Sequence, residues 1–396
     1  MRMVSWEWLL GIWTCVGVAW WVVAFILVVS ARSRRPDAQS ADTRRITVFK
    51  PLPRHLSDRE FARFDSPIES FIADLDNNSE LLIGCHQPDQ ARLEAYVKKM
   101  RDRYPGAAIK LVVHENPNRY PHPKVSWMRV LAPHATGELW LWSDSDMHAP
   151  PGTIRSMRAD YADTKARCLT SPYVIKHPGT AAEMLDALYV NLEFYPGVVL
   201  LSGQNMIQFG LGSGMLFEAE DFKRRVDWEF LGGCLADDFH LGGLLKPTQL
   251  GTMCLTTVPA ENGWAGALLH YLRWQKNIRW CRPLPYAAQL VVIPLLGWLV
   301  WLLANPREPI AWMGLAAVLA ADFIAALAIC RVVGCRISWN RLYTVPFWSF
   351  MRGIAWFACW FPWPIVWRGR KWWSPHQAVK PQPEVLETQR QPGHVD

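Results

Sequence analysis

The stretch WLWSDSDMHAPP, residues 140–151, is the most informative part of this chain. An apolar, aromatic run stops on two acids, Asp144 and Asp146, which are separated by one small residue. The sequence before it is typical of a turn, and the sequence after it is typical of a loop that leads into a helix. We therefore expect both acids at the carboxyl end of a buried strand, where open α/β sheets bind their ligands.

Strand-like and helix-like patterns alternate through residues 46–283. Buried strands are indicated by four short apolar runs, at 46–50, 80–85, 109–114 and 138–144. Helical periodicity occurs between them at 66–75, with Ser66 as the expected cap, at 90–104 and at 125–135. This order predicts an α/β fold with a mostly parallel, doubly wound sheet.

Long apolar segments flank this region. The chain has 396 residues, and 23 of them are tryptophan, which concentrates at membrane–water interfaces. Residues 5–30 exceed the roughly 20 apolar residues that cross a bilayer, and a basic run follows at 32–35. Because cationic flanks stay on the cytoplasmic side, we expect residues 1–31 to be a retained anchor and residues 46–283 to be a cytosolic domain.

A second membrane region is expected at residues 284–371. Residues 286–304 and 310–330 are each long and apolar enough to span a bilayer. Arg352 and several prolines interrupt the apolar run 342–367, and both its flanks are basic, so we expect a re-entrant or interfacial hairpin there. The polar residues 374–396 predict a disordered tail. The expected location is the inner, cytoplasmic membrane, with several crossings.

The net charge of +7 is concentrated beside the apolar segments. Eleven arginines and lysines lie in those flanks, so the rest of the chain is net acidic. This distribution suits anionic lipid headgroups and argues against a nucleic-acid partner, which would need a basic face on the soluble domain. The nine cysteines form no CxxC pair, which favours a reducing cytosol over disulfides or a zinc site.

The acids at 144 and 146 suit a divalent cation. Carboxylates at i and i+2 after a strand can share one Mg²⁺ or Mn²⁺ ion. Such an ion can bridge two phosphates and neutralise the charge that builds on a departing diphosphate, as a nucleotide-sugar transferase requires. The alternative is a pair of solvated surface aspartates.

A second acidic pair, Asp237 and Asp238, lies in the sequence CLADDFHLGGLL. An inverting glycosyl transfer needs a carboxylate that takes the proton from the acceptor hydroxyl. Since the two residues are adjacent, a regular backbone would let only one of them face the site. The alternative is an acidic pair that stabilises the N-terminus of a helix.

Residues 268–283 combine arginine with tryptophan. Arginine can clamp a phosphate with two hydrogen bonds, and tryptophan can pack against a sugar or a lipid. An interfacial amphipathic helix would have the same composition. The glycine-rich GLGSGM at 210–215 would let the backbone approach a donor or acceptor, or would form an ordinary turn.

Together these residues resemble the D…D…D…(Q/R)xxRW signature of ceramide glucosyltransferases and their bacterial relatives, including hopanoid-biosynthesis glycosyltransferases. The matching positions are Asp89, DSD at 144–146, ADD at 236–238 and HYLRW at 270–274. Similar stretches, among them TVFKPL (47–52), HPKVSW (122–127) and WRGRK (367–371), extend the resemblance over residues 46–371.

The resemblance implies a GT-A fold that uses a UDP-sugar. It makes Asp238 the catalytic base and assigns the metal ion to Asp144 and Asp146. The further residues that it places at the donor and acceptor are Asp89, Lys124, Asp144, His270, Arg273 and Trp274. His270 departs from the pattern, which has Gln or Arg there, and Arg279 with Trp280 nearly fits the same motif.

The leading hypothesis is a membrane-bound inverting glycosyltransferase that transfers a hexose to the hydroxyl of a lipid, either a ceramide or a hopanoid. A processive polysaccharide synthase would need more spans to form an export channel. A non-catalytic membrane scaffold of the same fold would have lost at least one of the acidic positions, and all of them are present.

Overall fold

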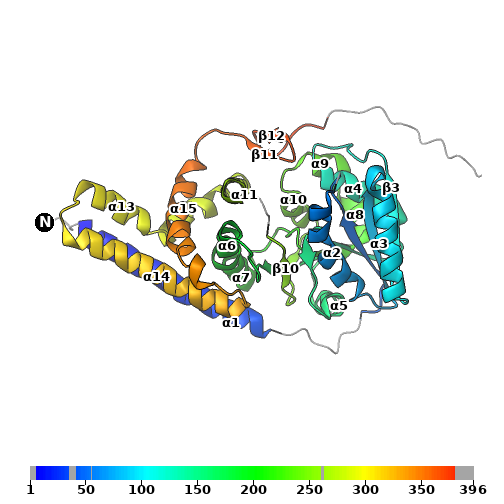
Figure 1. The fold of residues 1–396 in the computed structure, drawn as a ribbon, viewed down its shortest axis with the longest axis horizontal. Helices are drawn as coiled ribbons and strands as arrows, with labels where there is room; N and C mark the ends of the chain where they lie inside the picture. The colour runs from blue at the N-terminus through cyan, green and yellow to red at the C-terminus, as the bar shows by residue number, and fades with distance from the viewer. Residues whose placement is uncertain (1–5, 35–41, 55, 260–262, 380–396) are drawn as a thin grey trace, which may run out of the picture.

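A seven-stranded sheet forms the centre of an α/β unit in the computed structural model, which describes residues 6–34, 42–54, 56–259 and 263–379 (Figure 1). The strand order is β3-β2-β1-β4-β8-β6-β9. β8 is antiparallel to both of its neighbours and the other pairs are parallel, so the predicted mostly parallel sheet is confirmed. The strands are β1 (Ile46–Pro51), β2 (Ser79–His86), β3 (Ala108–His114), β4 (Leu139–Trp142), β6 (Cys168–Thr170), β8 (Met215–Glu218) and β9 (Thr248–Leu250).

A second sheet of three short strands begins directly after the DSD sequence. Its strands are β5 (Met147–His148), β10 (Leu255–Thr257) and β7 (Tyr173–Val174). The helices of the α/β unit are α2 (Asp58–Ile72), η1 (Gln87–Asp89), α3 (Gln90–Arg103), α4 (Pro123–Leu131), η2 (Ala132–His134), α5 (Thr153–Asp163), α8 (Ala219–Arg225), α9 (Trp228–Gly233) and α10 (Asp237–Leu244).

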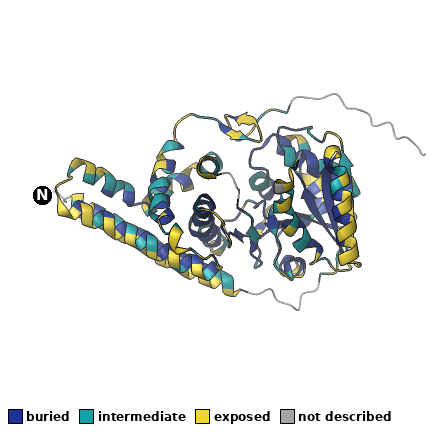
Figure 2. Cartoon of the chain, viewed as in Figure 1, coloured by how far each residue is buried: buried dark blue, intermediate teal, exposed yellow. Residues whose placement is uncertain are grey.

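Both faces of the large sheet are buried, as continuous apolar runs in parallel strands require (Figure 2). Val48 and Leu141 point into the core on one face, whereas Phe49, Trp140 and Trp142 point into an aromatic core on the other. The first of these cores continues into the apolar helices at the N- and C-terminal ends of the chain. The α/β unit and these helices therefore share one hydrophobic core.

Helix α2 begins eight residues earlier than the expected helix at 66–75. Ser57, not Ser66, is its cap: Ser57 Oγ accepts the Glu60 N–H at 3.2 Å, and Glu60 Oε2 accepts the Ser57 N–H at 3.0 Å. This reciprocal pair satisfies two amides that the first turn leaves free. Ser66 and Pro67 lie inside the helix, so the expected cap at Ser66 is wrong.

The apolar helices form a bundle beside the α/β unit (Figure 1). Its members are α1 (Trp6–Ser33), α6 (Ala181–Leu188), the π-helical η3 (Tyr189–Phe194), α7 (Tyr195–Gly203), α11 (Gly263–Cys281), α12 (Pro283–Ala288), η4 (Gln289–Val292), α13 (Leu295–Ala304), α14 (Pro309–Val333), η5 (Trp339–Arg341) and α15 (Thr344–Ala358). Within the described residues, α1, α14 and the stretch Ala181–Gly203 are long and apolar enough to cross a membrane. The third of these was not predicted, and it is mostly buried inside the protein.

The segment expected as a membrane span at 286–304 is broken. Pro283–Val292 and Leu295–Ala304 meet at an angle of 60°. Pro294, at the break, has no N–H to continue the helix. Gly17 of α1 packs so closely here that a Cβ would lie 2.8 Å from the Pro294 ring. The break is therefore fixed in place by the N-terminal helix.

Arg352, which interrupts the last apolar run, is buried in α15 between two acids. Its guanidinium lies 3.7 Å from Asp322 of α14 and 4.0 Å from Glu193 of η3. Trp21 Nε1 of α1 donates to Asp322 Oδ1 at 2.7 Å, and Trp348 Nε1 donates to Glu193 Oε1 at 2.7 Å. These contacts accommodate the ionisable groups inside an apolar bundle and join four of its elements.

The C-terminal part of the run 342–367 is not helical. After α15 the chain forms a two-stranded hairpin of β11 (Ile365–Trp367) and β12 (Arg370–Trp372). Residues 374–377, which we expected to be disordered, pair instead with the chain before α10: Leu235 N donates to Pro375 O and Gln377 N donates to Gly233 O. The expected tail beyond residue 379 lies outside the described residues.

Candidate active site

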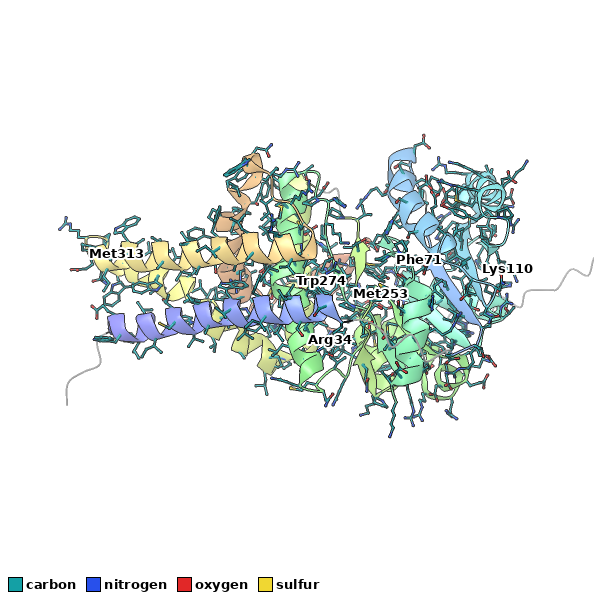
Figure 3. The ribbon with its side chains drawn as sticks, turned by 90° about the horizontal axis from the view of Figure 1, so that it is seen from below. Arg34, Phe71, Lys110, Met253, Trp274 and Met313 are labelled. Atoms are coloured by element: carbon teal, nitrogen blue, oxygen red, sulfur yellow. The ribbon has the colours of Figure 1, made fainter. Side chains whose placement is uncertain are left out.

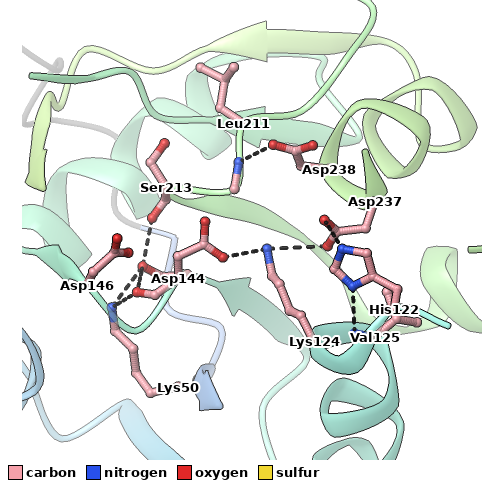
Figure 4. A network of polar contacts seen from close by, with 12 residues as sticks. Lys50, His122, Lys124, Val125, Asp144, Asp146, Leu211, Ser213, Asp237 and Asp238 are labelled. Carbon is pink, nitrogen blue, oxygen red and sulfur yellow. Dashed lines mark hydrogen bonds and ion pairs between the residues drawn. The ribbon is translucent and has the colours of Figure 1, made fainter. Parts of the chain in front are cut away.

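Lys50 organises the loop that carries DSD. It is the residue before the last in the buried strand β1, and its ammonium donates to Ser143 Oγ at 3.0 Å, to the Asp144 carbonyl at 2.6 Å and to the Met147 carbonyl at 3.1 Å (Figure 4). Burial lowers the pKa of Lys50 to about 7. Sequence analysis did not assign Lys50 to the site, although a lysine that ends an apolar strand was a usable signal.

A chain of ion pairs connects Asp144 with the second acidic pair. Lys124 Nζ lies 2.7 Å from Asp144 Oδ1 and 3.3 Å from Asp237 Oδ2. His122 Nε2 lies 3.4 Å from Asp237 Oδ1, while Nδ1 accepts the Val125 N–H at 3.4 Å (Figure 4). The predicted residues Lys124 and Asp144 are thus in direct contact, and His122 was missed as their partner.

The charges in this chain of contacts oppose the effect of burial. Burial alone would lower the pKa of Lys124, but the carboxylates of Asp144, Asp237 and Asp238 outweigh it and raise that pKa. In the same way burial would raise the pKa of Asp237, but Lys124 and His122 hold it below its usual value. Lys124 and Asp237 therefore stay ionised at neutral pH.

Asp238 differs from Asp237, because its pKa is raised and not lowered. Its Oδ2 accepts the Gly212 N–H at 2.8 Å. Burial, followed by the charge of Asp237, raises its pKa to about 7. We expected only one of the two adjacent acids to face the site, but both do, because they occupy the first turn of α10 and their side chains diverge from it. A carboxyl group with a pKa near neutrality can accept or release a proton.

The glycine-rich loop at 210–215 lies between the two acidic pairs. A Cβ built on Gly212 would be 2.6 Å from Asp144 Oδ2 and 3.3 Å from Asp238 Oδ2. The Gly212 carbonyl also accepts the Asp144 N–H at 3.0 Å. Only a residue without a side chain lets both carboxylates approach one point of the backbone. This loop therefore has a specific place in the site and is not an ordinary turn.

Asp146 completes the acidic region from the other side. Thr257 Oγ1 donates to Asp146 Oδ2 at 3.4 Å, and burial, with the charge of Asp144, raises the pKa of Asp146. The phenol of Tyr173, on β7, is buried in the field of Asp146, Asp238 and Asp144, and its pKa is raised, first by burial and then by these charges. Tyr173 is, after Lys50 and His122, a third residue that sequence analysis missed.

The carboxylates of Asp144 and Asp146 fit a divalent cation that the protein and a bound substrate hold together. Asp144 Oδ1 is paired with Lys124, but the side chain is 37% exposed and Oδ2 faces Gly212. In the described part of the chain, no three histidine, cysteine or acidic side chains are gathered to hold a cation by themselves. Mg²⁺ is commonly held by one or two carboxylates together with substrate phosphates, and Asp144 with Asp146 supplies such a pair.

Helix α11, a member of the bundle, carries the HYLRW motif at residues 270–274. Figure 3 labels its Trp274. His270 Nδ1 contacts Asp186 Oδ1 of α6 at 3.2 Å, and Trp274 Nε1 donates to His270 Nε2 at 2.7 Å. Arg273 lies in the field of Asp186 and Asp144, and its pKa is lowered to about 10 by burial and by the charge of Arg368. His270 therefore orients Trp274.

The rival pair on this helix lies elsewhere. Arg279 is stacked over the Trp360 ring, 5.4 Å from its centroid, and Trp280 packs with Leu235 and Trp372. Their environment favours Arg273 and Trp274 over Arg279 and Trp280 as the motif that serves the site.

Asp89 follows β2, at the edge of the sheet where β4 also ends. Its side chain is buried at the start of α3. The structure thus brings Asp89 to the expected edge, two strands from the DSD loop.

A GT-A glycosyltransferase is the class that this fold and this acidic site define. The chain resembles the solved mannosyltransferase PcManGT from Pyrobaculum calidifontis, described in complex with GDP-Man and Mn²⁺, with a TM-score of 0.50 and 16% identity over 90% of this chain and 97% of that one. The chain belongs to glycosyl transferase family 21, which residues 10–373 match. The family resemblance seen in the sequence is thereby confirmed.

Other solved structures are less similar. Glucosyl-3-phosphoglycerate synthase from Mycobacterium tuberculosis aligns with 16% identity over 56% of this chain and 74% of that one, at a TM-score of 0.34. TarS from S. aureus aligns with 12% identity over 85% and 98%, at a TM-score of 0.35. A comparison with curated protein sequences finds no match.

Proposed function

We propose that this protein is a membrane-bound inverting glycosyltransferase that transfers a hexose from a UDP-sugar to a lipid hydroxyl group, on a ceramide or hopanoid-like acceptor. One observation carries this proposal: the carboxylates of Asp144 and Asp238 both lie next to the space that a Cβ on Gly212 would fill, at 2.6 and 3.3 Å from it. A donor held at Asp144 would therefore lie within reach of a base at Asp238.

Asp238 is the proposed general base. Its pKa of about 7 leaves the carboxylate available near neutral pH and still basic enough to take a proton from an acceptor hydroxyl. The Gly212 N–H, at 2.8 Å, orients the carboxylate. Proton removal makes the hydroxyl oxygen a nucleophile toward the anomeric carbon of the sugar, and attack from the face opposite the diphosphate inverts that carbon.

Asp144 and Asp146 would hold Mg²⁺ or Mn²⁺, which when bound would neutralise negative charge on the departing diphosphate. Lys124 holds Asp144 in position through its 2.7 Å contact. Lys50 fixes the backbone of the same loop. Asp89 is proposed to contact the nucleotide, and Trp274, oriented by His270, is proposed to pack against the sugar or the lipid.

The lipid acceptor is supported by the position of the apolar helices. The bundle that contains α1 and α14 continues the hydrophobic core of the α/β unit, and α11 of that bundle carries Arg273. A lipid in a bilayer around these helices would bring its polar head to the acidic site without leaving the membrane. In this orientation the α/β unit lies in the cytosol at the inner membrane.

The test uses the full-length chain in nanodiscs with Mn²⁺ and radiolabelled UDP-glucose, UDP-galactose, UDP-N-acetylglucosamine or GDP-mannose. Ceramide, a hopanoid polyol and diacylglycerol are supplied in turn. We expect label from a UDP-sugar in the lipid extract, and NMR of the product should show an inverted anomeric centre. Label in insoluble polymer would favour a polysaccharide synthase, and no turnover with any donor would refute the proposal.

A further inference from the structure

An apolar groove opens on the surface of the helix bundle, between α14 and the start of α15. Its volume is about 490 Å³. Its walls are formed by Ala320, Phe323 and Ile324 on α14 and by Leu342, Tyr343 and Pro346 on the segment that faces it. Figure 2 shows exposed residues along α14, and Ile324 is 67% exposed. Because α14 is long and apolar enough to cross a membrane, this groove would contact the hydrocarbon chains of lipids.

One face of α14 leads from the groove to a cation. Ile324, Leu327 and Arg331 are all exposed. Seven residues make nearly two helical turns, so Arg331 lies on the same face as Ile324, about 10 Å farther along the helix. That end of α14 lies against the α/β unit, because a Cβ on its C-cap, Gly334, would be 3.9 Å from Lys176 Cδ, two residues after β7. The face is therefore apolar inside the membrane and cationic at the surface beside the α/β unit.

The loop that joins α14 to the second wall of the groove carries Arg336 and Trp339. Both are exposed, and Trp339, at 89%, is the most exposed large apolar side chain in the described part of the chain. Tryptophan suits the headgroup layer of a bilayer. Arg341, at the end of the loop, donates to the carbonyls of Pro178 and Gly179 and so fixes the loop to the bundle.

Arg331 and Arg336 have no acidic partner of their own. Neither forms an ion pair within the described residues, and residues 323–346 contain no aspartate or glutamate. The last acid before them on α14, Asp322, is buried against Arg352. The helix dipole favours a cation in the last turn, which accounts for Arg331 but not for Arg336, two residues beyond the C-cap. Two exposed guanidinium groups thus remain beside an apolar groove.

We propose that this groove binds an acyl chain of an anionic phospholipid, whose headgroup is held by Arg331 and Arg336 at the membrane surface. Guanidinium groups bind phosphate oxygens with paired hydrogen bonds, and basic pockets between membrane helices bind anionic headgroups. A phospholipid suits the position because its chain and its charge match the groove and the arginines in this order. The inference requires α14 to cross the membrane, but it does not depend on the reaction proposed above.

Arg331→Gln is the most direct test, because glutamine removes the charge and still favours a helix. The matched control is Arg307→Gln: Arg307 is exposed and lies just before the opposite end of α14, so the same charge is lost away from the groove. Ala320→Phe fills the groove from an exposed position on α14. All three variants are made in the full-length chain, and their melting temperatures in detergent are compared with that of the wild type.

The measurement is the dissociation constant of the first bound lipid, by native mass spectrometry with dioleoyl phosphatidylglycerol or dioleoyl phosphatidylcholine. A cation near a membrane surface strengthens the binding of an anionic lipid about fivefold, so the two arginines should make the wild type prefer phosphatidylglycerol roughly twentyfold. Arg331→Gln should weaken phosphatidylglycerol binding about fivefold and leave phosphatidylcholine binding unchanged. Arg307→Gln should change neither, and Ala320→Phe should weaken the binding of both lipids.

Equal affinity of the wild type for the two lipids would refute the headgroup site. Equal losses in Arg331→Gln and Arg307→Gln would also refute it, because the effect would then come from surface charge in general. Unchanged phosphatidylglycerol binding in Ala320→Phe would refute the groove as the place of the acyl chain. Sugar transfer is not part of this measurement, so none of these results bears on the proposed function.

Discussion

Gly212→Ala should strongly slow the enzyme without unfolding it. Gly212 is not among the glycines with positive φ, so alanine can adopt its backbone conformation. The new methyl group would lie 2.6 Å from Asp144 Oδ2, the free end of a side chain that can move. The clash is therefore relieved by displacing the carboxylate and not the backbone.

The size of the effect follows from that displacement. Ordinary contact begins near 3.4 Å, so Asp144 Oδ2 must move by about 0.8 Å, and a misplacement of roughly 1 Å costs about a hundredfold in rate. A hundredfold lower kcat corresponds to about 2.7 kcal/mol of transition-state stabilisation. The free energy of unfolding should change by less than about 1 kcal/mol, because alanine also restricts the unfolded chain.

The assay measures UDP release and label in lipid at saturating donor, together with the melting temperature. Gly243→Ala is the control: it also lies on the α10 side of this loop, and its Cβ would meet its nearest neighbour, Gln208 O, at a comfortable 3.5 Å. We expect normal kcat in the control. Normal kcat in Gly212→Ala as well would mean that the approach of Asp144 to Asp238 is not the reaction centre.

Asp238→Asn should abolish transfer and leave UDP-sugar binding largely intact, which single-turnover and binding measurements would separate; near-normal turnover would exclude Asp238 as the base. Because the base acts in its ionised form, kcat of the wild type should fall as pH decreases through about 7, the raised pKa of Asp238. A pH profile flat between 6 and 8 would contradict this. Asp144→Ala should weaken donor binding with Mn²⁺ but not with EDTA, and equal losses in both would argue against a metal ligand. Trp348→Phe removes the donor to Glu193 and should destabilise the bundle by about 1.5–3 kcal/mol, seen as a lower melting temperature in detergent.

The sheet and one edge of the site could be predicted because they depend on local pattern. Short apolar runs with helices between them have few folded solutions, and the position of DSD after such a run places both acids at the carboxyl edge. The family resemblance then added Lys124 and assigned roles to Asp238 and the Arg-Trp motif. None of these inferences required a distance between remote segments.

Long-range contacts decided the rest. The start of α2 is an exception, because it depends on a local capping box at Ser57 that was missed when Ser66 was expected as the cap. The break at Pro294 is held by Gly17, and residues 374–377 are ordered by strand pairing with Gly233–Leu235.

The sequence by itself determined an α/β sheet with acids at its ligand-binding edge and apolar segments on either side. Periodicity and strand ends depend on residues that are close together in the sequence. Only the tertiary structure decided that Lys50, His122 and Tyr173 belong to the site and that both acids of the second pair face it. The physical reason is that burial and the charge of neighbours set the ionisation of these groups, and neighbours remote along the chain exist only after folding.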